Sequence, residues 1–259
     1  MKAVILVGGH GIRLRPLSCG IPKPMVPVLN RPLLEHVMLN AAKHNVTDFI
    51  LALNYLPEVI KENFGDGNRL GIRISYAVEE TPLGTSGAVK NAGPFLDEPF
   101  FVFNGDMLTG IDLGEMMRRH QEVKPKVTIA LTPVDNPIIY GIVEQDEHGM
   151  VKRFVEKPTW DKVTTNLINA GIYILEPEVL QHIPSATYSM FETDLFPKLL
   201  EMGEPVLSFP SDAYWIDIGD PQKYLKANCD LLMQRGKEIF IEGKCYIDPK
   251  AEIDPPVLL

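Results

Sequence analysis

Short apolar runs alternate with amphipathic stretches through the first hundred residues. Residues 2–7 form an apolar run that ends at Gly8-Gly9, and similar runs occupy 49–53, 72–77 and 99–103. Such runs, bounded by turn residues, predict buried strands. Apolar residues recur at helical spacing over 32–45, and helices are also expected at 57–64 and 85–93. This alternation predicts an α/β fold with a mostly parallel, mixed, Rossmann-like central sheet and helices on both faces.

The second half of the chain adds further elements. Strands are predicted at 127–132, 140–144, 151–155 and 168–174, and helices at 189–202 and 221–235. We therefore expect one large domain over residues 1–235 and a separate tail over 236–259.

The tail has a six-residue period. Ile241, Ile247, Ile253 and Leu259 are six residues apart, with Asp-Pro pairs between some of them. This spacing is typical of a parallel β-helix, so we expect the start of a left-handed β-helix coil, truncated or vestigial. One ordinary strand followed by turns is the alternative.

Composition narrows the function classes. The 259 residues carry 25 Lys and Arg against 34 Asp and Glu, a net charge of −9. An acidic chain lacks the basic face that nucleic-acid binding needs, so no such partner is expected. No apolar run is long enough for a membrane span or a signal-peptide core, and the three cysteines are widely spaced. These features predict a soluble, cytoplasmic protein.

The acidic charge is unevenly distributed, because the first 34 residues contain no Asp or Glu. Within them, Gly8, Gly9 and Gly11 directly follow the first predicted strand. Glycines there let backbone N–H groups approach an anion closely. Arg13 and Lys23 follow, and Lys23 lies between two prolines that stiffen its loop. The segment predicts a polyphosphate site, although it lacks both the third glycine of the dinucleotide fingerprint and the Gly-Lys-Ser/Thr of a P-loop.

Two aspartates follow apolar strands. Asp106 comes after the run at 99–103, and Asp217 lies in Trp215-Ile216-Asp217-Ile218-Gly219. Ligands of open α/β sheets bind at the carboxyl ends of strands. Two carboxylates together with phosphate oxygens suit Mg²⁺, so we predict a magnesium site at Asp106 and Asp217.

The glycine loop and the later motifs resemble those of the sugar-1-phosphate nucleotidyltransferases. The matching residues include Gly8, Gly9, Gly11, Arg13-Leu14, Pro16-Leu17 and Pro22-Lys23-Pro24, while Ile12 stands where the family usually has Thr or Ser. The resemblance covers about residues 1–235. The stretch from Trp215 to Leu225 is most similar to the mannose-1-phosphate guanylyltransferase branch.

The resemblance implies partners and residue roles. A sugar 1-phosphate would attack the α-phosphorus of a nucleoside triphosphate and release pyrophosphate, with Mg²⁺ as cofactor. The implied catalytic residues are Arg13, Lys23 and Asp106, and the implied metal ligands are Asp106 and Asp217. The implied nucleotide contacts are Gly8, Gly9, Gly11, Glu80 and Gly84, and the implied sugar-phosphate contacts are Gly141, Glu156, Lys157 and Asn169.

The base and the sugar are less firmly indicated. A carboxylate at Glu79 or Glu80 would accept both donors on one edge of guanine, which favours GTP. Mannose 1-phosphate is the favoured sugar. The alternatives are a glucose-1-phosphate thymidylyl- or uridylyltransferase, a non-catalytic regulatory subunit suggested by Ile12, and a nicotinamide oxidoreductase disfavoured by the missing glycine. The oligomeric state is open, with a homodimer as the candidate.

Overall fold

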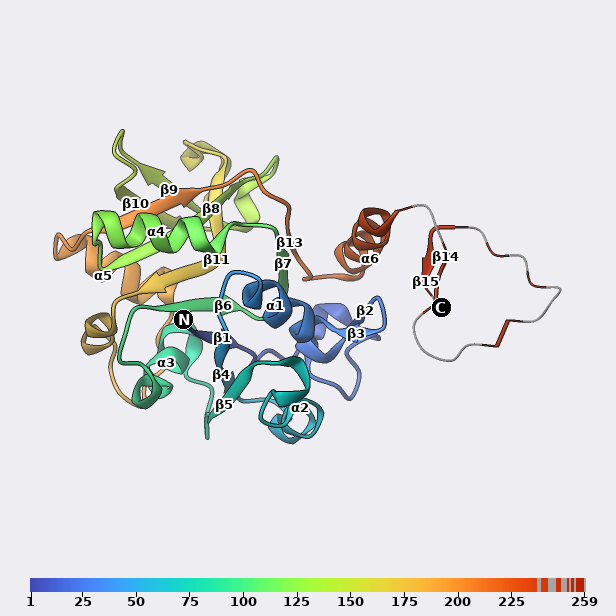
Figure 1. Cartoon of the computed structure of the whole chain (residues 1–259). Helices are drawn as coiled ribbons and strands as arrows, with labels where there is room; N and C mark the ends of the chain where they lie inside the picture. Colours follow the sequence, from blue (N-terminus) through green and yellow to red (C-terminus); the bar gives the residue numbers. More distant parts are fainter. Residues whose placement is uncertain (237–238, 242–245, 248–250, 252, 254, 259) are drawn as a thin grey trace.

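The computed structural model describes residues 1–236, 239–241, 246–247, 251, 253 and 255–258. Figure 1 shows the arrangement of the helices and strands. The helices are α1 (Leu33–Ala42), α2 (Pro57–Phe64), α3 (Gly84–Asn91), α4 (Leu113–Val123), α5 (Phe196–Glu201) and α6 (Pro221–Arg235). The strands of the main sheet are β1 (Lys2–Leu6), β4 (Asp48–Leu53), β5 (Arg73–Val78), β6 (Phe100–Asn104), β8 (Val127–Pro133), β9 (Gly141–Gln145), β10 (Val151–Glu156), β11 (Leu167–Leu175) and β12 (Val206–Pro210).

The main sheet is mixed. Its order is β10-β9-β11-β6-β1-β4-β5, and β8 pairs with both β11 and β12. The four adjacent strands β6, β1, β4 and β5 run parallel to one another, whereas β11 is antiparallel to β6, β8 and β9. Because the chain leaves β1 for β4 on one side and later returns to β6 on the other, the sheet changes winding direction at β1. Ligand sites of open α/β sheets form at such a point.

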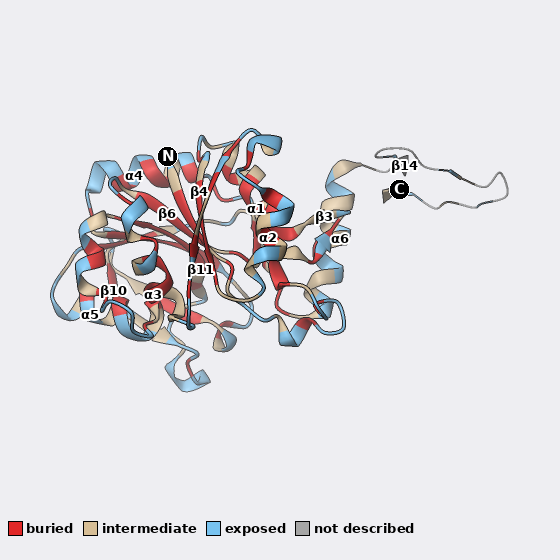
Figure 2. Ribbon diagram, turned by 90° about the horizontal axis from the view of Figure 1, so that it is seen from below, coloured by how far each residue is buried: buried red, intermediate tan, exposed pale blue. Residues whose placement is uncertain are grey.

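Strand alternation divides the core between the two faces of the sheet. Ala3 and Ile5 of β1 pack with the apolar sides of α1, α2 and α4, whereas Val4 packs with α3 and α5. Figure 2 shows the strands buried and the outer sides of the helices exposed. Helices therefore cover both faces, as the sequence predicts, and the mixed α/β class is confirmed.

Smaller elements attach to the main sheet. The strands β7 (Met107–Thr109) and β13 (Trp215–Asp217) form an antiparallel pair, and β2 (Pro27–Val28) pairs with β3 (Arg31–Pro32). A third apolar cluster contains Leu14, Val28, Ile216, Ile218 and Ala227. This cluster packs the first loop of the chain, β13 and α6 together, and so fixes three segments that are remote in sequence.

The tail gives partial information on the predicted β-helix. The strands β14 (Ile239–Phe240) and β15 (Val257–Leu258) are parallel, and Ile239 pairs with Val257. This offset of 257 − 239 = 18 residues equals three six-residue periods. Leu259 and most of the intervening residues lie outside the described part of the chain, so the coil stays a prediction. The division at residue 235 also stays a prediction, although α6 ends there.

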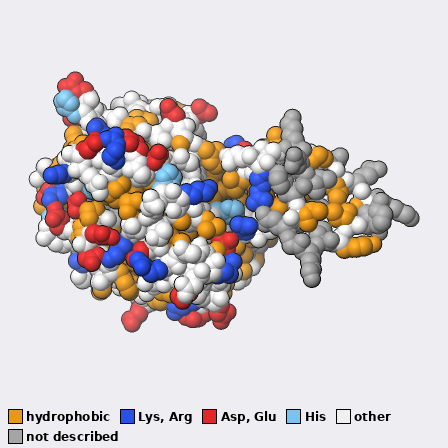
Figure 3. All heavy atoms as spheres, viewed as in Figure 1, with side chains coloured by type: hydrophobic (Ala, Val, Ile, Leu, Met, Phe, Trp, Pro, Cys, Tyr) orange, Lys and Arg blue, Asp and Glu red, His pale blue; other side chains and the backbone are white. Residues whose placement is uncertain are grey.

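Charges of both signs are interspersed over the face of the molecule in Figure 3. The acid-free N-terminal segment is partly neutralised from elsewhere in the chain, because Lys2 pairs with Asp97 and Lys23 with Asp106. Among the described residues, every helix is too short or too polar to cross a lipid bilayer.

Candidate functional site

A cavity of about 400 Å³ lies at the carboxyl edge of the parallel strands. The ends of four strands line it: Leu6 of β1 with Gly8 and Gly9, Ala52 of β4 with Asn54, Glu79 after β5, and Asn104 of β6 with Asp106. The start of α3 adds Gly84 and Thr85, and Lys23 lies on the wall. Five of the predicted site residues thus line one cavity: Gly8, Gly9, Lys23, Gly84 and Asp106.

Gly11 does not line the cavity, but its missing side chain positions a residue that does. Its backbone is left-handed, with φ of 63°. A Cβ atom at Gly11 would lie 2.9 Å from the Cβ of Lys23 and 3.2 Å from that of Ser18. The Ser18 hydroxyl donates to the Gly11 carbonyl at 2.6 Å. Only glycine lets Lys23 pass this close, so Gly11 has a structural role beside Lys23.

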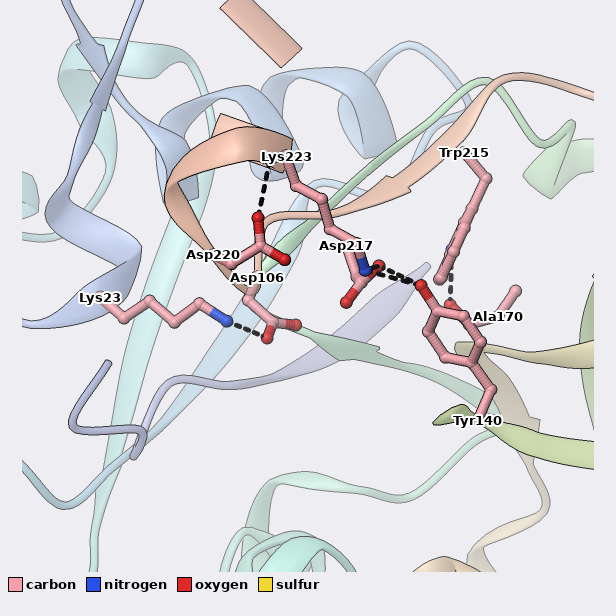
Figure 4. A network of polar contacts seen from close by, with 8 residues as sticks. All are labelled: Lys23, Asp106, Tyr140, Ala170, Trp215, Asp217, Asp220 and Lys223. Atoms are coloured by element: carbon pink, nitrogen blue, oxygen red, sulfur yellow. Dashed lines mark hydrogen bonds and ion pairs between the residues drawn. The ribbon is translucent and has the colours of Figure 1, made fainter. Parts of the chain in front are cut away.

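Lys23 and Asp106 form an ion pair on the cavity wall (Figure 4). Lys23 is only 8% exposed, and its Nζ atom donates to Oδ2 of Asp106. Gly105, which precedes Asp106, lets the chain pass close to the end of β1, because a Cβ there would lie 2.6 Å from the carbonyl oxygen of Leu6. The pair places an ammonium group and a carboxylate side by side at the cavity lining.

Asp217 lies next to Asp106 through strand pairing. Asp217 is opposite Met107 in the β13–β7 pair, and the N–H of Ile218 donates to the Asp106 carbonyl at 2.7 Å. Arg13 reaches the same place. A Cβ on Gly219 would lie 3.2 Å from Oδ2 of Asp217 and 3.5 Å from Nη2 of Arg13. The structure therefore brings Arg13, Asp106 and Asp217 together from three distant parts of the sequence.

The Asp217 carboxylate is held by α6 and by the loop before β9. Nζ of Lys223 donates to Oδ1 of Asp217 at 2.5 Å, and the Tyr140 hydroxyl donates to the same oxygen at 2.7 Å. Burial lowers the pKa of Lys223, but the hydrogen bonds to Asp217 and Tyr140 outweigh it, so the net shift is upward. Lys223 is therefore a firmly protonated neighbour of Asp217.

The predicted sugar-phosphate residues lie beyond Tyr140. Gly141 is buried, and a Cβ there would lie 2.7 Å from Oε2 of Glu156. Burial raises the pKa of Glu156, with Lys157 acting in the opposite direction, and the Lys157 Nζ lies 3.7 Å from Oε1. Lys157 itself has a left-handed backbone, with φ of 43°. Glycine at 141 thus leaves room for the Glu156 carboxylate.

Asn169 shapes a bulge in β11. Its Oδ1 accepts from the N–H of Gly171 at 2.9 Å, and its Nδ2 donates to the hydroxyl of buried Tyr173 at 2.8 Å. The pairing of β11 with β8 shifts register between Asn169 and Tyr173. Each of these bonds uses one N–H and one lone pair of the amide, which has a second of each.

A family model described as nucleotidyl transferase matches residues 2–234. This chain belongs to the nucleotidyl transferase family. It is 39% identical to the mannose-1-phosphate guanylyltransferase of Mycobacterium tuberculosis over 234 residues, covering 90% of this chain and 65% of that protein. It is 40% identical to the mannose-1-phosphate guanyltransferase of Debaryomyces hansenii over 268 residues, covering 98% of this chain and 73% of that one.

A solved structure of HddC from Yersinia pseudotuberculosis complexed with GMP-PN superimposes on this nucleotidyl transferase with a TM-score of 0.77. The two chains are 32% identical, and the match covers 89% of this chain and 99% of HddC.

The donor set of this nucleotidyl transferase fits the predicted Mg²⁺. Within the described residues, no group of three or more His, Cys, Asp or Glu side chains is arranged to hold a metal. Asp106 and Asp217 offer two carboxylates. Mg²⁺ is ordinarily bound through one or two carboxylates, substrate phosphates and waters rather than by an all-protein cage. Two adjacent aspartates beside a cavity that could admit phosphates fit such an ion.

Of the two carboxylates considered for the base, Glu79 and the predicted Glu80, only Glu79 lines the cavity. Glu80 is exposed and does not line the cavity, whereas Glu79 is 8% exposed and does. Burial raises the pKa of Glu79, offset in part by the N–H of Leu83, which donates to Oε2 at 2.9 Å. In an alternating strand end, adjacent side chains point to opposite sides, which explains why only one of the two reaches the cavity.

Lys223 and Glu192 have no predicted role in the sequence, yet Lys223 contacts Asp217 and Glu192 contacts Thr85 of the cavity lining. The partly buried Glu192 carboxylate accepts from the Thr85 hydroxyl at 3.3 Å and from the Tyr173 hydroxyl at 3.5 Å. Burial raises its pKa, and nearby Glu156 adds to the shift. Glu192 lies in a single π-helical turn at 191–195, a feature that often marks functional sites. Of the two, only Lys223 could have been noticed in the sequence, because it lies three residues after Asp220, which caps helix α6.

Proposed function

We propose that this nucleotidyl transferase joins GTP and mannose 1-phosphate to form GDP-mannose and pyrophosphate. One observation carries the proposal: Arg13, Asp106 and Asp217 meet beside a cavity lined by the first glycine loop. The names of the two relatives that are about 40% identical supply the substrate pair.

The reaction is a direct phosphoryl displacement. An oxygen of the sugar phosphate forms a bond to the α-phosphorus as the bond to the leaving pyrophosphate breaks, so no covalent enzyme intermediate is needed. The protein contributes position and charge neutralisation. Arg13 would hold the leaving pyrophosphate, and Lys23 would neutralise charge near the α-phosphate. When bound by Asp106 and Asp217, Mg²⁺ would supply Lewis-acid stabilisation of the phosphate oxygens.

The two substrates would occupy adjacent regions. The guanine base would lie near Glu79, whose Oε1 is 4.0 Å from the position of a Cβ on Gly8, at the cavity wall. The sugar would lie near Gly141, with Glu156 and Asn169 as hydroxyl partners and Lys157 beside its phosphate. Tyr140 connects the regions, because it precedes Gly141 and contacts Asp217.

Pyrophosphate release tests the proposal. GTP, UTP, dTTP and ATP would each be combined with mannose 1-phosphate and with glucose 1-phosphate in the presence of Mg²⁺. We expect GTP with mannose 1-phosphate to give the highest kcat/KM, and Asp217→Asn to abolish the Mg²⁺-dependent rate. Preference for dTTP or UTP with glucose 1-phosphate would support that alternative transferase. Absence of release with every pair would instead support a regulatory subunit.

A further inference from the structure

The two oxygens of the Asp217 carboxylate have different surroundings. Oδ1 accepts from both Lys223 and Tyr140, and the Lys223 ammonium also donates to the Tyr140 hydroxyl at 2.7 Å. These three side chains form a closed triangle of hydrogen bonds (Figure 4). Oδ2 instead lies beside Gly219, on the side where Arg13 approaches. One oxygen is thus anchored by Lys223 and Tyr140, and the other lies on the side of Arg13, the residue proposed to hold the leaving pyrophosphate.

The triangle is sheltered and rigid. The side chains of Lys223 and Asp217 are 26% and 22% exposed. The ammonium lies 5.1 Å from the centroid of the Tyr140 ring, which packs edge-on against Trp215. The indole N–H of Trp215 donates to the Ala170 carbonyl at 2.9 Å. The position of the Tyr140 hydroxyl is therefore fixed by the sheet, as well as by Lys223.

Lys223 occupies a place that its own helix does not favour. The Asp220 side chain caps α6 by accepting from the N–H of Lys223 at 2.9 Å, so Lys223 is the third residue of the helix. A capping box has Glu or Gln at that position. A positive charge near a helix N-terminus is also opposed by the helix dipole. Because local helix energetics disfavour a lysine here, the contact with Asp217 is the better explanation for it.

Lys223 differs from Lys23, the other lysine paired with a predicted metal ligand. Lys23 lines the cavity, where it can turn to a phosphate. Lys223 does not line that cavity, and its ammonium is engaged by two partners on the far side of the carboxylate. Lys223 is thus placed behind Asp217, as expected for a group that orients a ligand.

We propose that Lys223, together with Tyr140, positions Asp217 so that Oδ2 is presented to the Mg²⁺ held with the triphosphate. The proposal rests on the proposed function, because it needs Asp217 to be a metal ligand. Hydrogen-bonded partners that orient a metal ligand typically contribute about 10–100-fold to metal affinity. Lys223 is accordingly a positioning residue, with no contact to substrate.

Binding of Mn²⁺, a paramagnetic substitute for Mg²⁺, tests this without turnover. Electron paramagnetic resonance of the full chain with a non-hydrolysable GTP analogue would give the Mn²⁺ dissociation constant. We expect Lys223→Met and Lys223→Gln each to weaken Mn²⁺ binding about 10–100-fold. Tyr140→Phe should weaken it by less, because the Lys223 contact remains, and Lys223→Arg should restore part of the loss.

Lys226→Met is the matched control. Lys226 lies one turn away on α6, is exposed, and pairs with Asp230 rather than with Asp217. It should leave Mn²⁺ affinity and melting temperature unchanged. Both Lys223 variants are needed because one of them could fail to fold, and their melting temperatures check this.

Several outcomes would overturn the proposal. If the Lys223 variants bind Mn²⁺ like the parent but raise the KM for mannose 1-phosphate, Lys223 is a substrate contact. If they bind Mn²⁺ more tightly, Lys223 competes with the metal. If Asp217→Asn also binds Mn²⁺ normally, the metal assignment itself fails, and the positioning role fails with it. Loss in Asp217→Asn with none in the Lys223 variants overturns only the positioning role.

Discussion

Alanine substitutions at three glycines near the first loop separate three physical effects. Gly11 has a left-handed backbone, and a Cβ there would lie 2.9 Å from Cβ of Lys23. Gly20 is also left-handed, with φ of 80°, but a Cβ there would meet nothing within 4 Å. Gly9 has neither a left-handed backbone nor a neighbour within that distance. The series therefore isolates backbone strain, steric contact and intrusion into the cavity.

The expected stabilities follow from these geometries. A left-handed backbone costs an alanine about 1–2 kcal/mol, of which about 0.4–1 kcal/mol is offset by the smaller entropy of the unfolded chain. Gly20→Ala should therefore lose about 1 kcal/mol. Gly11→Ala adds a contact with Cβ of Lys23, which cannot rotate away, and overpacking costs about 1–3 kcal/mol more. Gly9→Ala should stay within about 0.5 kcal/mol of the parent.

Activity should follow a different order. Gly9→Ala places a methyl group in the space expected to hold phosphates, so the KM for GTP should rise at unchanged stability. Gly11→Ala should lower kcat, because it displaces Lys23 from Asp106. Gly20→Ala should change neither constant, since Gly20 does not line the cavity.

Urea unfolding and pyrophosphate release measure the two quantities separately. Each kcal/mol corresponds to about 2–4 °C in melting temperature for a chain of this size. Equal stabilities of Gly11→Ala and Gly20→Ala would show that the Lys23 contact is not limiting. A loss of stability in Gly9→Ala as large as that in Gly11→Ala would refute the reasoning altogether.

Three further predictions concern charged residues. Arg13→Ala should lower kcat by about 100–1,000-fold with little change in melting temperature, whereas exposed Arg15→Ala should change neither; equal losses of turnover in both variants would contradict the role of Arg13. Glu79→Gln should reduce the preference for GTP over UTP in kcat/KM, and Glu80→Gln, at an exposed position, should not; the reverse result would return the base contact to Glu80. The raised pKa of Glu192 means that the fold favours its protonated form, so its stability contribution is present at low pH and is lost as pH rises through the folded-state pKa. Glu192→Gln should therefore raise the melting temperature at pH 8, and the gain should disappear below about pH 4, near the ordinary carboxyl pKa; a gain independent of pH would exclude this explanation.

Local patterns were sufficient for most of the main sheet. Strands such as β1 and β6 are short apolar runs that end in glycine, and this signal requires no knowledge of distant residues. Helix α4 has no predicted counterpart, although Leu113, Met116 and Met117 follow helical spacing and Asp112 caps it. Its exposed side is strongly charged, so a weak apolar stripe is easily overlooked in a polar segment.

The short strand pair β7–β13 has no comparable local signal. Asp217 meets Met107 across 110 residues, and three-residue strands carry too little periodicity to predict. The steric reasons for particular glycines could not be predicted from the sequence either. Gly84 is required because a Cβ there would lie 2.4 Å from the carbonyl oxygen of Ser189, which no local pattern shows.

The same long-range contacts explain why the site can be assembled before any substrate binds. Asp106 and Asp217 are adjacent carboxylates that would repel each other if they were left unpaired, and such repulsion is strong where water is scarce. Lys23 and Lys223 each neutralise one of them, from opposite ends of the chain. If Lys23 binds phosphate and Lys223 orients Asp217, the two lysines should respond differently when the nucleotide and Mg²⁺ bind. Lys23 lies on the cavity wall and would be able to leave Asp106 for a phosphate if that carboxylate held Mg²⁺, whereas Lys223 is also bonded to Tyr140 and is expected to keep its position. The carboxylates are therefore neutralised both before and after substrate binding, and only Lys23 is expected to move between the two states.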